Sequence, residues 1–293
     1  MSNYIFGFEE LENNLHPALQ RRLFLYLRKI AVDTGCKFFI TTHSNVVIDL
    51  FFNDEEAQIL HVVHDGRSAT VKQVTSYLHH KNILDDLDVR ASDILQSNCI
   101  VWVEGPSDRI YFNRWIELLT NGKLQEGVHY QCVFYGGRLL AHLSATAPED
   151  HSEDLIKLLR INHNAIILID SDKRAKTDNI NTTKQRILAE IMEVDGIGWV
   201  TAGKEIENYI PVEALRAHYN NVTLSELGQY HDIINYLNKI KAKEGNRFKQ
   251  NKVFFADKVC QYITEQNIEG VLDLKERLTE VINQIKIWNK TKT

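Results

Sequence analysis

The chain has 293 residues, of which 44% are hydrophobic and 25% are charged, and its formal net charge is −5. This size and composition predict two globular domains. The sequence has no run of about 18 apolar residues, which would indicate a membrane span, and no basic-then-apolar start, which would indicate a secretion signal. The four cysteines show no Cys-x-x-Cys pairing, so we expect packed thiols in a cytoplasmic protein without a membrane partner.

The start of the chain predicts a strand, a helix and a second strand. A short apolar strand ends at Glu9 and Glu10, residues 15–32 carry leucines at helical spacing, and residues 37–40 form the next strand. His43 follows that strand. Taken alone, it is typical of a capping or buried histidine, whereas its place one strand–helix–strand unit after the two acids favours a role beside them.

The motif FEELENNLHP and the later THS resemble the Walker B segment and switch histidine of ABC-type ATPases, in the form used by OLD and SMC-like proteins. The resemblance implies that Glu9 is the acid on the Mg²⁺ side, Glu10 orients the attacking water and His43 senses the γ-phosphate. Glu9 replaces the usual Asp, and Leu11 the usual Pro. A P-loop needs G-x-x-x-x-G-K-[ST], and the near miss at residues 198–205 has Glu in place of the hydroxyl. We therefore expect the distal half of an ATPase, with no ATP binding by this chain alone.

The remaining pattern predicts the domain organisation. Residues 57–74 read as two strands that close the ATPase part at residues 1–75, and the polar residues 76–96 are a connecting segment. Residues 97–211 alternate strands with helices, and residues 212–293 are mainly helical and polar. The predicted fold class is therefore α/β: a partial ATPase sheet, then a parallel sheet flanked by helices, then a helical C-terminal tail.

Two apolar strands in the middle of the chain each end in a pair of acids. Residues 100–103 stop at Glu104, before Gly-Pro and a helix that opens with Asp108. A second apolar run leads to Asp170 and Asp172, which point the same way on an extended backbone. Open α/β sheets bind ligands beyond the carboxyl ends of their strands, so these acids predict a Mg²⁺ or Mn²⁺ site if the strands are neighbours. Any one of these acids taken alone is more often solvated or a helix cap.

The segments VEGPSD and LIDSD resemble the Toprim domain of topoisomerases, primases and OLD-family (overcoming lysogenization defect) ATP-dependent endonucleases. KEIENYIP is similar to the segment after the last core strand in the OLD nucleases, which implies a further metal-binding carboxylate from Glu205 or Glu207. Those nucleases also carry a lysine ahead of a helix. Lys252 matches it by position, which implies that it stabilises charge during cleavage. OLD-family members serve in phage defence, as in the Gabija system, and the sequence does not separate that role from DNA repair.

Basic residues near these motifs are candidates for DNA contact. Lys173, Arg174 and Lys176 follow the second pair of acids, and Arg247 and Lys249 lie in a basic stretch ahead of the candidate lysine. A solvated loop is the simpler interpretation of the first set and an equal alternative for the second.

We therefore expect a DNA endonuclease that cleaves phosphodiester bonds with the help of Mg²⁺ or Mn²⁺. Its expected partners are DNA and either a second copy, in a dimer or larger homo-oligomer, or a chain that supplies the missing ATPase half. A non-catalytic assembly module is the alternative, because a partial ATPase can persist as a dimer surface. The helical tail is too small for the catalytic tyrosine domain of a topoisomerase, which excludes that class.

Overall fold

The computed structural model describes residues 4–51, 54, 56–64, 67–73, 97–135, 164–193 and 195–290. The chain forms two compact units, Met1–Gln96 and Ser97–Thr293. Among the described residues, no helix combines the length and the apolar character that crossing a membrane requires. The predicted connecting segment at residues 76–96 lies outside the described residues.

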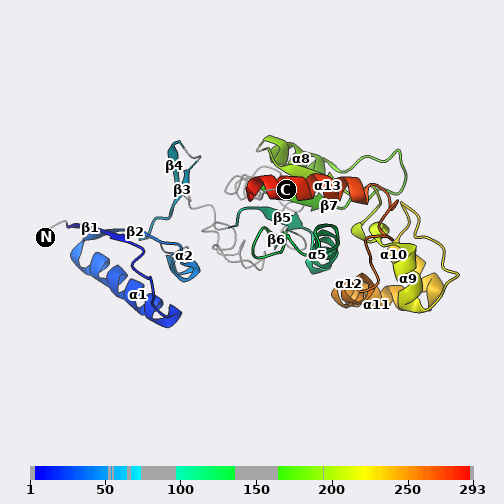
Figure 1. The fold of residues 1–293 in the computed structure, drawn as a ribbon, viewed down its shortest axis with the longest axis horizontal. Helices are drawn as coiled ribbons and strands as arrows, with labels where there is room; N and C mark the ends of the chain where they lie inside the picture. Colours follow the sequence, from blue (N-terminus) through cyan, green and yellow to red (C-terminus); the bar gives the residue numbers. More distant parts are fainter. Residues whose placement is uncertain are drawn as a thin grey trace. The chain divides into compact units, whose positions relative to one another are not determined.

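The first unit begins with a strand–helix–strand motif (Figure 1). Its elements are β1 (Ile5–Glu9), α1 (Pro17–Thr34), β2 (Lys37–Thr41), α2 (Asn45–Phe51), β3 (Leu60–His64) and β4 (Ala69–Gln73). β1 and β2 are parallel, and β3 and β4 form an antiparallel hairpin. α1 ends at Thr34 and is followed by Gly35, whose φ of 75° is a left-handed conformation that glycine adopts at low cost. The predicted order of strands and helix in this unit is confirmed.

Much of the apolar surface of the first unit is exposed. Phe24 of α1 is fully buried and meets Phe51 of α2 edge to face. In the two-stranded sheet, by contrast, Ile5 is 68% exposed and Phe39 is 60% exposed. The two side chains share one face, because the register places Ile5 opposite Lys37 and residues two apart along a strand point the same way. Within the described residues this face has no covering layer, which the apolar faces of sheets normally have.

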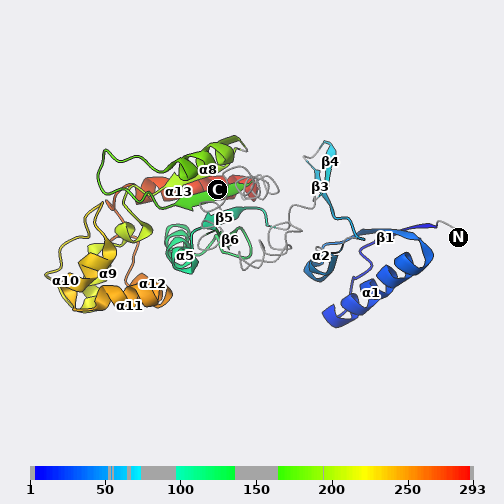
Figure 2. The same ribbon diagram turned by 180° about the vertical axis from the view of Figure 1, so that it is seen from behind.

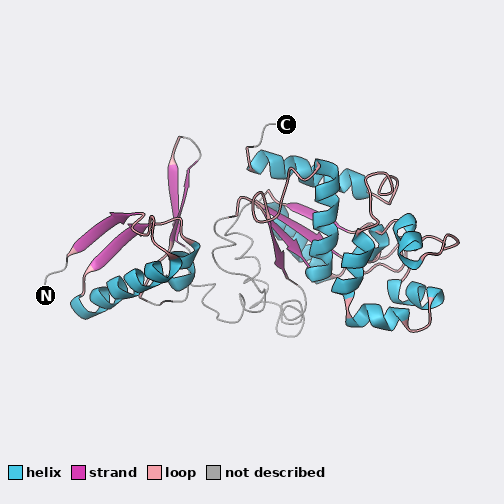
Figure 3. Ribbon diagram, turned by 60° about the horizontal axis from the view of Figure 1, so that its bottom comes forward, coloured by secondary structure: helices cyan, strands magenta, loops and turns pink. Residues whose placement is uncertain are grey.

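The second unit is built on a four-stranded parallel sheet (Figure 3). Its strands, in spatial order, are β6 (Gln131–Phe134), β5 (Ile100–Val103), β7 (Ala165–Ile169) and β8 (Ile197–Val200). β5 pairs with both β6 and β7, so the two acid-terminated strands are neighbours, as the prediction of a metal site requires. Every residue of β5 and β7 is buried, which is typical of parallel strands covered on both faces.

Helices pack on both faces of this sheet, namely α5 (Pro106–Thr120), α8 (Thr182–Glu193) and α13 (Leu274–Trp288). On one face, Val101 of β5 shares a core with Trp115 of α5 and Leu278 of α13. On the other face, α8 approaches β8 so closely that a Cβ on Gly198 would lie 2.5 Å from Leu188 Cδ2. The α/β architecture with helices on both faces of a parallel sheet is therefore confirmed.

Shorter helices follow the last strand and gather at one end of the unit (Figure 2). They are η2 (Ile206–Tyr209), α9 (Val212–Tyr219), α10 (Ile233–Ile240), α11 (Glu244–Gln250) and α12 (Lys252–Cys260). Phe248, Phe255 and Val259 belong to the same buried core as Tyr111 of α5. These helices therefore pack into the core of the sheet. The basic stretch around Arg247 forms α11, so its interpretation as a loop is wrong.

Candidate functional site

Glu104 and Asp108 lie where β5 gives way to α5. Asp108 is 6% exposed, and its carboxylate accepts hydrogen bonds from Gly105 N at 3.0 Å and from Ser107 Oγ at 3.1 Å. Asp108 therefore caps the first turn of α5, a role typical of an acid at a helix start. Burial, followed by the charge of Glu104, raises the pKa of Asp108 to about 6. Burial also raises the pKa of Glu104.

Asp170 and Asp172 follow β7, but the backbone between them is not an extended strand. β7 ends at Ile169, and Asp172 has a φ of 56°, in the left-handed region. Oδ1 of Asp170 is buried without a hydrogen-bond partner among the described residues, whereas the side chain of Asp172 is 67% exposed. Burial and the charges of Asp108 and Glu207 raise the pKa of Asp170 well above its usual range. Strand alternation therefore does not point both acids toward one ion, and that prediction is wrong.

Of the two acids in KEIENYIP, Glu207 is the one whose carboxylate oxygens lack a hydrogen-bond partner in the described part of the chain. Glu207 is 1% exposed, and in the described part of the chain neither Oε1 nor Oε2 has a hydrogen-bond partner. Burial raises the pKa of Glu207 to about 8, although the charge of Lys252 opposes this shift. Glu205, in contrast, uses Oε1 to accept a hydrogen bond of 3.2 Å from Ile233 N at the start of α10.

Lys252 begins α12 beside Glu207. Asn251 caps this helix by accepting a hydrogen bond of 3.0 Å from Phe254 N. Lys252 Nζ lies 3.7 Å from Glu207 Oε1 and 5.3 Å from the centre of the Phe248 ring, with 44% of the side chain exposed. Burial disfavours the charge of Lys252, but Glu207 and the other nearby acids outweigh it and raise the lysine pKa. The predicted lysine therefore lies beside a predicted carboxylate and still reaches solvent.

A second lysine, Lys184 of α8, lies among the same acids and was not anticipated from sequence. Its Nζ donates a hydrogen bond of 2.7 Å to Asp170 O and contacts the carboxylate of Asp172. The sequence does contain a signal for it. Lys184 lies on the buried face of α8 with Ile187 and Ile191, a position that an amphipathic helix normally fills with an apolar residue.

The donor chemistry of this cluster fits a hard cation. Such ions bind several carboxylate oxygens. A buried carboxylate oxygen without a hydrogen-bond partner, as in Asp170 and Glu207, costs free energy unless a positive charge offsets it. Within the described ranges, no three His, Cys, Asp or Glu side chains are already gathered closely enough to hold a metal ion. The acids would have to close on an ion to bind it, and metal binding stays a prediction.

The basic residues predicted to contact DNA are Lys173, Arg174, Lys176, Arg247 and Lys249. All are exposed except Lys173, which is half-buried. The first three lie in the loop between Asp172 and α8, and the last two lie on α11. Arg247 forms a surface ion pair with Glu244, with NH1 3.3 Å from Oε2. Their contact with DNA stays a prediction.

In the first unit, the ends of β1 and β2 bring Glu10 and His43 together. Glu10 Oε1 lies 3.5 Å from His43 Nε2, and Asn13 Nδ2 donates a hydrogen bond of 2.7 Å to Glu10 Oε2. Glu9, the last residue of β1, is exposed opposite Thr41. The structure therefore places the predicted acids and histidine at one edge of the sheet. Their roles toward a nucleotide stay predictions.

Glu12 is a further acid at this edge that was not singled out from sequence. It is 5% exposed, its Oε1 accepts a hydrogen bond from Thr42 Oγ1, and its Oε2 is buried without a partner in the described residues. Its proximity to the THS segment depends on the parallel pairing of β1 with β2, which the spacing of acids along the chain does not reveal.

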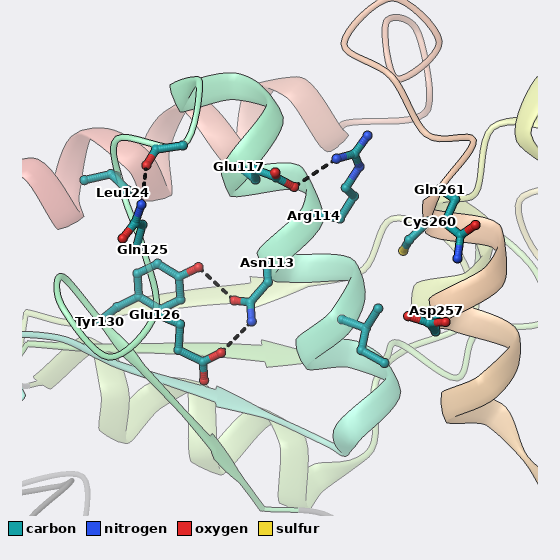
Figure 4. A pocket seen from close by; sticks show the side chains of 12 residues that line it. Asn113, Arg114, Glu117, Leu124, Gln125, Glu126, Tyr130, Asp257, Cys260 and Gln261 are labelled. Atoms are coloured by element: carbon teal, nitrogen blue, oxygen red, sulfur yellow. Dashed lines mark hydrogen bonds and ion pairs between the residues drawn. The ribbon is translucent and has the colours of Figure 1, made fainter.

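A separate hollow of about 740 Å³ lies between α5 and α12 (Figure 4). Asn113 links two residues of its wall, accepting a hydrogen bond of 2.8 Å from Tyr130 OH and donating one of 2.5 Å to Glu126 Oε2. Arg114 NH1 donates to Glu117 Oε2 at 2.9 Å. None of the predicted site residues lines this hollow, and its charged side chains form ion pairs, so the carboxylate cluster remains the candidate site.

Comparison with known proteins concerns the first unit. A family model described as an AAA ATPase domain matches residues 1–48. A search of curated proteins finds no match to the chain. The matched segment contains β1, α1 and β2, together with the paired Glu10 and His43. The N-terminal region of this chain is therefore of the AAA-type ATPase kind.

Proposed function

We propose that the second unit is a metal-dependent DNA endonuclease of the Toprim type, joined to the ATPase-like N-terminal region as in the OLD family. One observation carries this proposal. Acids that follow two neighbouring parallel strands lie near enough to Glu207 for their charges to raise the pKa of Asp170, and buried oxygens of Asp170 and Glu207 have no hydrogen-bond partner among the described residues. Lys252 Nζ lies 3.7 Å from one of those oxygens.

Each residue of the cluster has a role in this proposal. Glu104, Asp170 and Glu207 would hold Mg²⁺ or Mn²⁺, which when bound activates water and stabilises the leaving oxygen of a phosphodiester. Lys252 stabilises the negative charge that develops on the phosphate. The carboxylate of Glu207 and the Phe248 ring keep the Lys252 ammonium at this position.

Asp108 and Asp172 are the other two acids predicted at the strand ends. Asp108 fixes the turn after Glu104 through its bond to Gly105 N. Asp172 is more exposed and is the acid best able to move toward an ion. The exposed basic residues of the loop after Asp172 and of α11 neutralise DNA phosphates, which makes binding weaker as salt rises.

Cleavage of supercoiled plasmid tests the proposal. We expect nicked or linear product with Mg²⁺ or Mn²⁺, no product with EDTA, and a loss of activity in Glu104→Gln and Asp170→Asn. Glu265→Gln, which removes the same charge from an exposed position, serves as the matched control. Intact plasmid under all metal conditions, or full activity in both cluster variants, would refute the proposal.

The first unit supplies half of an ATPase site in this proposal. Glu9, Glu10 and His43 take the Walker B and switch roles of an ABC-type ATPase, and a P-loop comes from another polypeptide segment or a partner chain. The pairing of Glu10 with His43 supports this assignment. The exposed side chains of Ile5 and Phe39 on the β1–β2 sheet support the need for a further covering layer.

That same face favours a second candidate function, a non-catalytic assembly module. Ile5 and Phe39 form an apolar surface that a second copy could cover. Light scattering of the wild type and of Ile5→Glu/Phe39→Glu tests this. A stable wild-type dimer that the variant disperses, together with inactivity on plasmid, would favour assembly over catalysis. A monomeric wild type would exclude assembly through a second copy of this chain.

A further inference from the structure

Lys184 is a buried charge in a place where the fold alone requires none. Its side chain is 9% exposed, and it lies on the face of α8 that Ile187 and Ile191 bury against the sheet. Burying an ammonium is costly unless it is paired and hydrogen-bonded. An apolar residue would satisfy the packing of this helix, so the contacts of Lys184 Nζ must account for the lysine.

These contacts join the two ends of the turn that follows β7. Lys184 Nζ donates a hydrogen bond of 2.7 Å to Asp170 O and contacts one carboxylate oxygen of Asp172. Asp172 is held from its other side by its own backbone N, which donates a hydrogen bond of 2.8 Å to Lys204 O. The charge of Lys184 also acts on Glu104, where it opposes the rise in pKa caused by burial.

A cation that bridges a carbonyl oxygen and a carboxylate oxygen has the donor set that hard divalent ions take. Lys252 does not share this position, because its ammonium lies beside Glu207 Oε1 instead. The two lysines therefore have different places in the cluster: Lys252 is 44% exposed and reaches solvent, whereas Lys184 is enclosed and touches Asp172.

We propose that Lys184 is a built-in cation that competes with a divalent metal ion for the Asp172 carboxylate. Binding of the ion at Asp172 displaces the Lys184 ammonium from that carboxylate. This inference rests on the proposed metal-dependent function and adds a control on metal affinity. The lysine lowers the affinity for the ion and keeps the acids of the cluster compensated when no ion is bound.

Calorimetric titration of Mn²⁺ without DNA tests this, since it measures affinity rather than cleavage. Lys184→Met keeps the length of the side chain and removes its charge, and we expect Mn²⁺ to bind at least about tenfold more tightly, because one unit charge at contact range is removed. Lys184→Arg keeps the charge and is expected to bind Mn²⁺ as the wild type does. Lys123→Met removes the same charge from an exposed turn and is the control for net charge.

Unchanged or weaker Mn²⁺ binding by Lys184→Met would overturn the proposal. That result is expected of a lysine that only positions the acids, because its removal cannot free a carboxylate for the ion. If Lys184→Met does not fold, Lys184→Gln keeps a donor for Asp170 O without the charge, and the same increase in affinity is expected. The proposed function can fail independently of this inference. Mn²⁺ binding to the wild type without plasmid cleavage would refute the nuclease function, and the competition between Lys184 and Mn²⁺ could still be measured. Absence of Mn²⁺ binding in the wild type and in both uncharged variants would refute both.

Discussion

The replacement Glu207→Gln tests whether the cluster carries a carboxylate whose ionisation opposes folding. Burial raises the pKa of Glu207 from an ordinary value of 4.5 to about 8. The folded state therefore binds this proton more tightly than the unfolded state. The stability that the neutral carboxyl contributes is fully present below pH 4.5 and is lost as the pH rises through about 8.

The size of the effect follows from that shift. Between pH 5 and pH 8, ionisation of Glu207 removes about 3 kcal/mol from the free energy of unfolding of the metal-free wild type. The amide of Gln does not titrate, so Glu207→Gln keeps this stability. Any constant cost of burying an amide there cancels when the two pH values are compared. The stability of the variant relative to the wild type should rise by about 3 kcal/mol from pH 5 to pH 8.

Urea unfolding in EDTA, followed by tryptophan fluorescence, measures this difference. All four tryptophans, at positions 102, 115, 199 and 288, lie in the second unit, so the signal reports the unit that contains Glu207. Glu265→Gln is the control for loss of an exposed carboxylate and should show no such pH dependence. A stability difference between Glu207→Gln and wild type that is the same at every pH would show that the pKa of Glu207 is not raised by folding.

Two further predictions concern Lys252 and the binding of ATP. At saturating Mn²⁺, Lys252→Ala should cleave plasmid about a hundredfold more slowly than the wild type, since it removes a cation worth ~3 kcal/mol in the transition state; unchanged cleavage would make Lys252 an ordinary helix-start residue. Isothermal titration should show no micromolar ATP binding by this polypeptide, because Glu10 and His43 alone provide no amide cradle for phosphates. Micromolar ATP binding by this chain alone would contradict this prediction. Adding a partner chain that carries a P-loop should produce ATP binding.

Local patterns in the sequence predicted the elements that position the candidate site. The apolar run 100–103 and the breaker Gly105-Pro106 predicted β5 and α5, and the structure confirms both. The condition that the two acid-terminated strands be neighbours is also met. These features depend on residues close in sequence, where propensity and helix-start signals act directly.

The details that sequence reasoning missed depend on tertiary contacts. The left-handed backbone at Asp172 breaks the alternation expected of a strand. Lys184 reaches the acids only because α8 packs against the sheet, and Glu12 meets Thr42 only because β1 pairs with β2. The lysine on the apolar face of a helix was a readable signal, since such a position favours a functional or paired charge over a solvated one.

We propose above that the acids beyond β5 and β7 hold a divalent cation. The most direct measurement is the anomalous difference density of a crystal soaked in Mn²⁺. We expect a peak within about 2–2.6 Å of carboxylate oxygens from at least two of Glu104, Asp108, Asp170, Asp172 and Glu207. Manganese bound elsewhere on the chain, with these carboxylates dispersed, would contradict it.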